Sequence, residues 1–254
     1  MTAPVVSAFA VCVTRSKANS NTDSIASGGI MAEWTTIQAE DGHRLDLYIA
    51  RPTSPPIAGL VVLQEIFGVN AHIRSIADAF AQDGFLAVAP ALFDRIEKSI
   101  QLGYEGADRD RAMACLKQTN PSNAIKDVAA TLAYARQVTG KKAGVIGYCW
   151  GGLIAWLSAT RLHPDAAVAY YAGGIGNFAQ ETPQAPVQLH FGRLDTHIPA
   201  EQVNKVGSAH PEVEIHWYEN AGHAFNCDMR ASYHADSAAA ARLKASAFLR
   251  RHLA

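Results

Sequence analysis

Gly147-Tyr148-Cys149-Trp150-Gly151-Gly152 is the stretch of this sequence that decides the fold. It follows a mostly apolar segment, 142–146, typical of a short buried strand, and it precedes an apolar segment, 153–157, typical of the start of a helix. The cysteine therefore stands at a sharp turn between a strand and a helix. The glycines on either side of it leave room for neighbouring backbone that a Cβ atom would fill. The pattern predicts a turn that presents the sulfur of Cys149 to a substrate.

The spacing Gly-x-Cys-x-Gly at such a turn is typical of the nucleophile elbow of an α/β-hydrolase, although most of these enzymes have serine where this chain has cysteine. The N–H groups that begin the following helix favour a thiolate at Cys149. A free cysteine is more often a small buried hydrophobe. The elbow around Cys149 and the candidate partners further along the chain favour the nucleophile over that simpler interpretation.

Segments with strand and helix patterns alternate along the chain, and a hairpin is expected around Asp41-Gly42. Besides the strand before the elbow, strands are predicted at 34–38, 44–49, 60–63, 85–90, 166–171, 187–191 and 213–218. Helices are predicted at 71–81, 125–135 and 238–250, and a shorter one at 110–117 is a candidate lid. This alternation predicts the α/β class, as an α/β-hydrolase fold with a mostly parallel central sheet and helices on both faces.

The length of 254 residues suits one domain of this class, which we place at 31–254. Residues 1–30 differ from the rest because they are mostly small and polar after a mildly apolar start, without the positive charge that opens a secretory signal. We expect 1–30 to be a disordered N-terminal extension, or Met31 to be the native start.

The charge and cysteine content exclude several classes of protein. The formal net charge is −1 and no basic tail is present, which argues against nucleic acid or an anionic membrane as a partner. The four cysteines include no C-x-x-C pair, so they indicate neither a disulfide framework nor a zinc site. No apolar run is long enough to span a bilayer. We expect a cytoplasmic protein, as a monomer or a weak homo-oligomer.

A cysteine nucleophile needs a base and a group that orients the base. In α/β-hydrolases the acid and then the histidine follow the nucleophile along the chain. Asp195 follows one predicted strand and His223 follows the last one, so both lie at the carboxyl edge of the sheet, where sites in this architecture form. Each residue alone is more often a loop cap or a surface histidine. Together, in this order, they favour a catalytic triad with Cys149.

Three stretches resemble the motifs of the dienelactone hydrolase family. They are Gln64-Glu65-Ile66-Phe67-Gly68-Val69-Asn70, the elbow, and His216 to Glu219 with Ala221-Gly222-His223, and the resemblance covers the chain from about Trp34 to its C-terminus. The resemblance implies a cysteine-dependent hydrolase of a lactone or ester that works without a cofactor, through a thioester acyl-enzyme. The family's precedent is a carboxymethylenebutenolide opened to maleylacetate.

The resemblance also implies roles for three further residues. Glu65 would pair with the cysteine in the resting enzyme, until an anionic substrate displaces the carboxylate and the thiolate turns to His223. The alternative is that Glu65 pairs with a nearby cation or caps the helix that follows. The backbone N–H groups of Ile66 and Trp150 would form the oxyanion hole, in agreement with the general rule for this fold.

Substrate recognition is the point at which the sequence departs from the family. The family binds its substrate's carboxylate with two arginines, and Arg95 matches the first. The second belongs four residues after the histidine, where this chain has Cys227. Arg230 lies three residues further on. It either reaches the same pocket or is an ordinary surface charge.

The substrate is therefore expected to be a small ester or lactone, anionic if Arg230 takes part. The alternatives are a broader carboxylesterase or thioesterase on the same machinery and, with less support, a non-catalytic binding protein of the same fold. Tyr104, Tyr170 and Tyr171 could line the pocket, although core packing explains the last two better. No metal is expected, because the histidines at 190, 197 and 216 lack the spacing of a metal motif.

Overall fold

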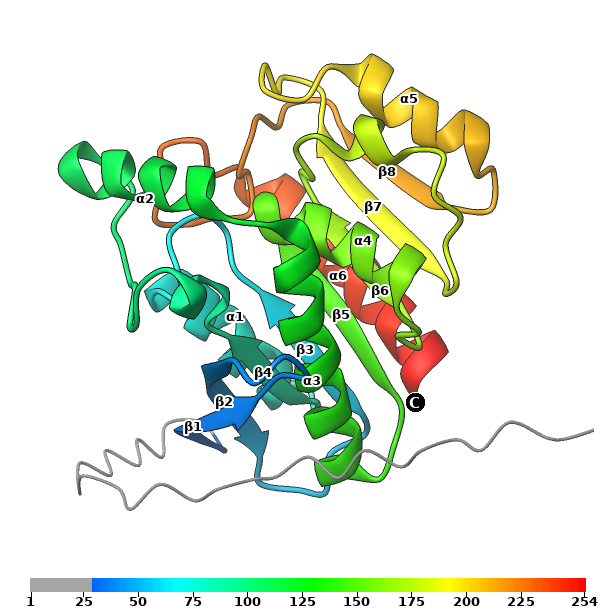
Figure 1. Ribbon diagram of the computed structural model, residues 1–254. Helices are drawn as coiled ribbons and strands as arrows, with labels where there is room; N and C mark the ends of the chain where they lie inside the picture. Colours follow the sequence, from blue (N-terminus) through cyan, green and yellow to red (C-terminus); the bar gives the residue numbers. More distant parts are fainter. Residues whose placement is uncertain (1–28) are drawn as a thin grey trace, which may run out of the picture.

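The computed structural model describes residues 29–254, and in this part of the chain all strands belong to one sheet (Figure 1). The predicted extension lies outside the described residues, apart from its last two positions. The strands are β1 (Ile30–Gln38), β2 (Arg44–Pro52), β3 (Gly59–Leu63), β4 (Leu86–Pro90), β5 (Ala143–Tyr148), β6 (Ala167–Tyr170), β7 (Val187–Gly192) and β8 (Glu214–Tyr218). Their order across the sheet is β1-β2-β4-β3-β5-β6-β7-β8.

The sheet is mostly parallel and is covered on both faces, which confirms the predicted fold class. Strands β1 and β2 form the expected antiparallel hairpin, β2 pairs antiparallel with β4, and the remaining neighbours are parallel. The helices are α1 (Ala71–Gln82), α2 (Gly106–Gln118), α3 (Pro121–Thr139), α4 (Trp150–Arg161), α5 (Ala200–Ala209) and α6 (Ala235–Leu253), with short 3-10 turns η1 (Leu92–Arg95) and η2 (Ile175–Phe178). Helices α3 and α4 pack on one face, and α1 and α6 lie behind the sheet in Figure 1.

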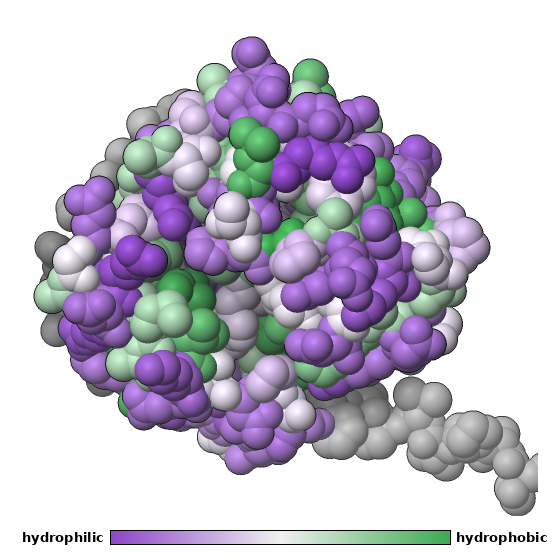
Figure 2. All heavy atoms as spheres, turned by 90° about the horizontal axis from the view of Figure 1, so that it is seen from above, coloured by the Kyte–Doolittle hydropathy of each residue, from purple (hydrophilic) through white to green (hydrophobic). Residues whose placement is uncertain are grey.

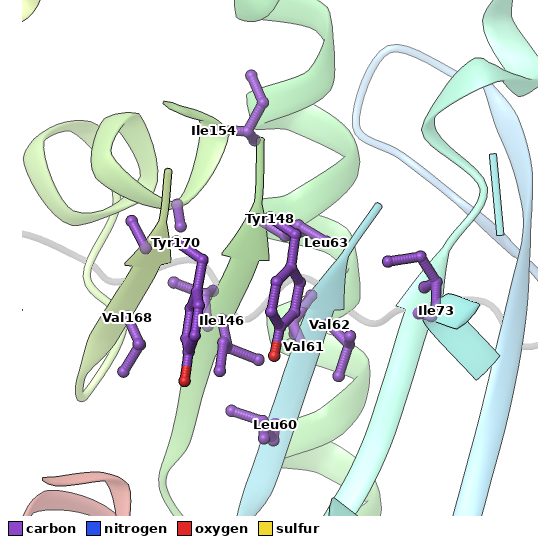
Figure 3. Packing of buried hydrophobic residues seen from close by; sticks show 14 of the residues in the cluster. Leu60, Val61, Val62, Leu63, Ile73, Ile146, Tyr148, Ile154, Val168 and Tyr170 are labelled. Carbon is purple, nitrogen blue, oxygen red and sulfur yellow. The ribbon is translucent and has the colours of Figure 1, made fainter. Parts of the chain in front are cut away.

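The centre of the sheet is buried on both faces, which explains its continuous apolar runs. Every residue of β3 and β5 is buried, and Figure 3 shows their side chains, together with those of β6, filling the space around the sheet. Tyr148 and Tyr170 lie side by side there, with ring centres 4.9 Å apart. The strand that leads to the elbow is thus buried along its whole length within the packed core.

Element boundaries differ from the prediction where the apolar pattern is weak. Helix α2 begins at Gly106, four residues before the predicted start, because only Ala112 and Cys115 of this helix are buried and the rest of its sequence gives little periodic signal. Helix α3 extends beyond the predicted 125–135 and is capped by Gly140, which adopts a left-handed conformation with φ of 64°. Among the helices of residues 29–254, none is long and apolar enough to cross a membrane.

Candidate active site

The elbow between β5 and α4 has the strained geometry that its sequence predicts. Cys149 has φ of 55° and ψ of −116°, and it occupies the N-cap of α4. A Cβ atom on Gly147 would lie 2.0 Å from the carbonyl oxygen of Gly151, and one on Gly151 would lie 2.4 Å from that of Gln64. Only glycine fits at these two positions. The backbone therefore fixes the sulfur at the carboxyl edge of the sheet.

Cys149, His223 and Asp195 form a continuous chain of contacts. The Nε2 atom of His223 lies 3.3 Å from Sγ of Cys149, and its Nδ1 atom lies 2.7 Å from Oδ2 of Asp195. The other carboxylate oxygen accepts the backbone N–H of His197 at 2.8 Å. The Asp195 side chain is 1% exposed. The elbow after β5 and the loops after β7 and β8 thus bring together the three residues that the sequence selected, in the order nucleophile, base and orienting acid.

The position of His223 between a carboxylate and a sulfur changes its protonation. Burial alone lowers the pKa of this histidine, but the hydrogen bonds to Asp195 and Cys149 and their charges outweigh burial and raise the pKa to about 10. The contacts with Asp195 and Cys149 thus favour the protonated form of the ring. A protonated imidazole beside a sulfur favours the thiolate, which is the nucleophilic form of cysteine.

Two backbone N–H groups near the elbow lack a protein acceptor in residues 29–254. Trp150 is the first residue of α4 and Ile66 follows β3, and within residues 29–254 neither N–H donates to a protein acceptor. Unpaired donors at a helix start are suited to an anion. The ring of Trp150 is fixed by Phe93, with centroids 5.3 Å apart. These are the two groups expected to form the oxyanion hole.

Glu65 contacts Arg230 rather than Cys149. Its Oε1 atom lies 3.9 Å from Nη1 of Arg230, and both carboxylate oxygens lack a hydrogen-bond partner in the described part of the chain. The side chain is 1% exposed. The expected pairing of Glu65 with the cysteine is therefore not the arrangement seen here, because the sulfur faces His223 and the carboxylate faces the guanidinium. Of the alternatives considered for Glu65, pairing with a cation is the one that this geometry supports.

Arg95 and Arg230 differ in how many of their N–H groups already donate to other residues. Arg95 donates to the buried Asp127 through Nε and Nη2, at 2.7 Å each, and to Asp41 through Nη1 and Nη2. Four of its five N–H donors are thereby used. Arg230 lies over the ring of Tyr104, 5.3 Å from its centre, and makes one long contact with Glu65. Within residues 29–254, Arg230 is thus the one of these two arginines with more donors left for a ligand.

A small hollow of about 80 Å³ adjoins Arg95 and Trp150. Its other lining residues are mostly polar and come from η1 and from the junction of α2 and α3: Leu92, Ile96, Gln118, Thr119, Asn120, Asn123 and Ala124. Figure 2 looks down on this side of the molecule, where hydrophilic residues surround a depression that contains apolar ones.

The sequence did not reveal a second group of side chains around Glu65. His72 on α1 and Cys227 after β8 offer ligand atoms that lie, with a carboxylate oxygen of Glu65, within 4.8 Å of one another, and all three residues are buried. Neither ring nitrogen of His72 has a hydrogen-bond partner in residues 29–254. No motif spacing links these positions, so only the fold could bring them together.

The tyrosines considered as pocket residues have different surroundings. Tyr171 packs edge-on against His223, with centroids 5.2 Å apart, and burial raises its pKa well above the usual value. Tyr170 stacks on His190 in the core, as packing predicts. Tyr104 accepts a hydrogen bond from Asn70 at 3.1 Å, beside Arg230. Tyr104 and Tyr171 therefore border the site.

Comparison with known proteins identifies the family. The model of the dienelactone hydrolase family matches residues 45–253. The chain is 32% identical over 228 residues to carboxymethylenebutenolidase of Pseudomonas putida, a match that covers 87% of this chain and 97% of that one.

Solved structures agree with this match. A crystal structure titled "putative dienelactone hydrolase", from Klebsiella pneumoniae, has 30% identity and a TM-score of 0.75, over 87% of this chain and 98% of that chain. A dienelactone hydrolase-like promiscuous phosphotriesterase from metagenomic libraries, at 20% identity and a TM-score of 0.73, covers 89% of this chain and all of that one, and shares the fold. The chain therefore belongs to the dienelactone hydrolase family and is a carboxylic ester hydrolase.

Proposed function

We propose that this protein is a cysteine-dependent hydrolase of a lactone or ester, with Cys149 as nucleophile, His223 as acid and base, and Asp195 as the group that orients His223. The observation that carries the proposal is the linear contact from the sulfur through both ring nitrogens to a buried carboxylate, at 3.3 and 2.7 Å. A nucleophile, a base and an orienting acid within hydrogen-bond reach are what covalent catalysis needs.

The reaction begins when the Cys149 thiolate attacks the carbonyl carbon. The carbonyl oxygen becomes an oxyanion and accepts the N–H groups of Ile66 and Trp150. The tetrahedral intermediate then collapses, the carbon–oxygen bond breaks, and the leaving alkoxide takes the proton of His223. The result is a thioester on Cys149 and an alcohol, which stays on the same molecule when the substrate is a lactone.

The second half of the reaction releases the acid. His223, now neutral, removes a proton from a water molecule as the water oxygen attacks the thioester carbon. The same two N–H groups stabilise the second oxyanion. Collapse of this intermediate breaks the carbon–sulfur bond, and the thiolate returns to its place beside the protonated His223. The hydrolysis thus consumes one water and needs no cofactor.

We propose an anionic substrate, with Arg230 as the group that binds its carboxylate. Among residues 29–254, the guanidinium is contacted by Glu65 and by the rings of Phe67 and Tyr104, and it donates no hydrogen bond to a protein acceptor. A substrate carboxylate that takes Arg230 would replace Glu65 as the partner of the guanidinium. The relative from Pseudomonas putida is named for a carboxymethylenebutenolide, and a dienelactone of that type is the substrate we propose.

The second candidate is a broader carboxylesterase or thioesterase that uses the same residues. It is favoured by the contacts of Arg95, which donates to Asp41 and Asp127. Arg95 is thus not placed to bind a substrate carboxylate together with a second arginine. Comparing kcat/KM for a dienelactone with that for a neutral aryl ester separates the two. Preference for the neutral ester, unchanged in Arg230→Gln, would select the broader enzyme. The alternative of a non-catalytic binding protein gains no support from the family match.

The acyl-enzyme provides the direct test of the mechanism. Mass spectrometry of the His223→Gln variant mixed with substrate is expected to show the acyl group on the peptide that contains Cys149, because the thioester forms slowly but is hydrolysed more slowly still. Cys149→Ala is expected to give no adduct and no turnover. Undiminished hydrolysis by Cys149→Ala would reject the assignment.

Several sequence predictions stay predictions. They are the single domain over 31–254, the cytoplasmic location, the monomeric or weakly oligomeric state, and the absence of a nucleic-acid or membrane partner.

A further inference from the structure

We propose that Glu65, His72 and Cys227 form a binding site for a thiophilic divalent cation of the Zn²⁺ class. The three residues come from the loop after β3, from α1 and from the loop after β8, and each offers one ligand atom within 4.8 Å of the other two. The catalytic sulfur is not a member of this group. The site is therefore separate from the Cys149–His223–Asp195 chain, although it shares the residue that holds Arg230.

Buried polar atoms that make no hydrogen bond are the observation that points to a ligand. Glu65 is 1% exposed and His72 is 2% exposed, and among the described residues neither carboxylate oxygen and neither ring nitrogen has a hydrogen-bond partner. Buried polar groups are normally paired, because an unpaired one costs roughly 1–3 kcal/mol. One cation bound between Glu65, His72 and Cys227 would give each of these buried groups a partner.

The donor set matches the coordination chemistry of zinc. Thiolate sulfur, imidazole nitrogen and carboxylate oxygen bind Zn²⁺ at about 2.0–2.3 Å in a tetrahedron, in which ligand atoms lie about 3.5 Å apart. The three atoms need to converge by roughly 1 Å from their separations of up to 4.8 Å. Three protein ligands leave one position for water.

Cysteine binds a metal as the thiolate, so the cation displaces one proton from Cys227 to solvent as the metal–sulfur bond forms. Asp228 lies 3.5 Å from Nδ1 of His72 and can orient the ring, as carboxylates do beside metal-binding histidines.

Arg230 is the competitor of the cation. Its positive charge lies 3.9 Å from Glu65, and a metal that binds Glu65 has to replace it. The Arg230 side chain is 27% exposed and can turn toward solvent. We therefore expect that removing the charge of Arg230 strengthens cation binding. Cation binding at an unrelated surface site would not respond in this way.

The test uses the full chain with Cys149→Ala, so that the catalytic sulfur cannot bind metal. The protein is freed of metals with a chelator, kept reduced with a phosphine, and titrated with Co²⁺ as a spectroscopic probe. We expect a thiolate-to-cobalt charge-transfer band that Zn²⁺ abolishes by displacement. In the same background, Cys227→Ser is expected to remove the band, whereas Cys115→Ser, which changes another buried cysteine, retains it.

Two further variants keep the test decisive if Cys227→Ser does not fold. His72→Gln is expected to weaken Zn²⁺ binding at least about tenfold, since even indirect partners of a metal ligand contribute that much. Arg230→Gln is expected to strengthen it severalfold, a gain that a misfolded chain does not give. The proposal is overturned if the Cys149→Ala protein gives no charge-transfer band, or if the band survives Cys227→Ser. It is also overturned if neither His72→Gln nor Arg230→Gln changes the affinity for Zn²⁺. Because this background does not hydrolyse substrate, these outcomes are independent of the proposed function.

Discussion

The guanidinium of Arg230 lies 3.9 Å from the buried carboxylate of Glu65, although Arg230 stands seven residues after His223 rather than four. The chain between them turns back on itself, since the N–H of Cys227 donates to Ala224 and that of Arg230 donates to Cys227. The path of this loop thus brings Arg230 to the site, although it lies three residues beyond the position at which the family has its second arginine.

Arg230→Gln is expected to raise KM for an anionic dienelactone by about 10- to 100-fold, because a hydrogen bond to a charged group contributes roughly 1.5–3 kcal/mol. The KM for a neutral aryl ester is expected to change little, and Arg230→Lys should restore part of the difference. Steady-state kinetics on both substrates provides the measurement. Arg193→Gln is the control, because Arg193 stacks on Trp217 at the surface. Equal losses on both substrates would contradict a role in binding the carboxylate.

Asp195→Asn is expected to lower kcat by about ten-thousand-fold, as loss of the orienting carboxylate does in serine triads. The amide no longer raises the pKa of His223, so the alkaline limb of the pH–rate profile should move to lower pH. Circular dichroism checks that the fold is intact. A variant with the normal profile and normal kcat would remove Asp195 from the mechanism.

Arg95→Gln is expected to destabilise the protein by roughly 3 kcal/mol, because it leaves the fully buried carboxylate of Asp127 without its cation. The double variant Arg95→Gln/Asp127→Asn should recover much of that loss. Urea unfolding measures both. If Arg95 instead serves the substrate, the single variant will unfold normally and show a raised KM for the anionic ester.

Gly151→Ala is expected to cost at least about 1–3 kcal/mol and most of the activity, since its Cβ would lie 2.4 Å from the carbonyl oxygen of Gln64, one residue before Glu65. Gly173→Ala is the matched control, with no atom within 4 Å of the added Cβ. Thermal unfolding and kcat/KM of the two variants give the comparison. Similar behaviour of both would mean that the elbow tolerates a side chain.

The stability of the protein is expected to depend on His223 between pH 6.5 and about 10. The folded state raises the pKa of this group from 6.5 to about 10, so its stabilising effect is complete below pH 6.5 and is lost as the pH rises through 10. The free energy of unfolding of the native chain should therefore exceed that of His223→Gln most at low pH, with a gap that narrows toward pH 10. A gap that widens with pH would show that the histidine is neutral in the folded state.

The sequence was sufficient to predict the parts of the fold that have strong local signals. Continuous apolar runs marked β3 and β4, the turn at Asp41-Gly42 marked the hairpin, and the glycine spacing marked the elbow. Helix α2 was predicted too short because most of its length is exposed and carries no apolar stripe.

The contacts of the charged side chains were not predictable in the same way. Glu65 and Arg230 are far apart in sequence, and nothing local indicates that the guanidinium rather than the sulfur faces the carboxylate. The carboxylates that hold Arg95 come from the hairpin turn and from α3, so they become visible only when the tertiary structure is known. The His72–Cys227 contact is hidden for the same reason.

The nucleophile is attached to β5, which has parallel neighbours on both sides in the middle of the sheet. Arg230, by contrast, lies in a loop. Helix α2 buries few of its side chains. Amide hydrogens around the elbow should exchange with solvent only when the whole domain opens, whereas those of α2 should exchange through local opening. Mutations on the exposed face of α2 are therefore expected to leave the reacting atoms in place.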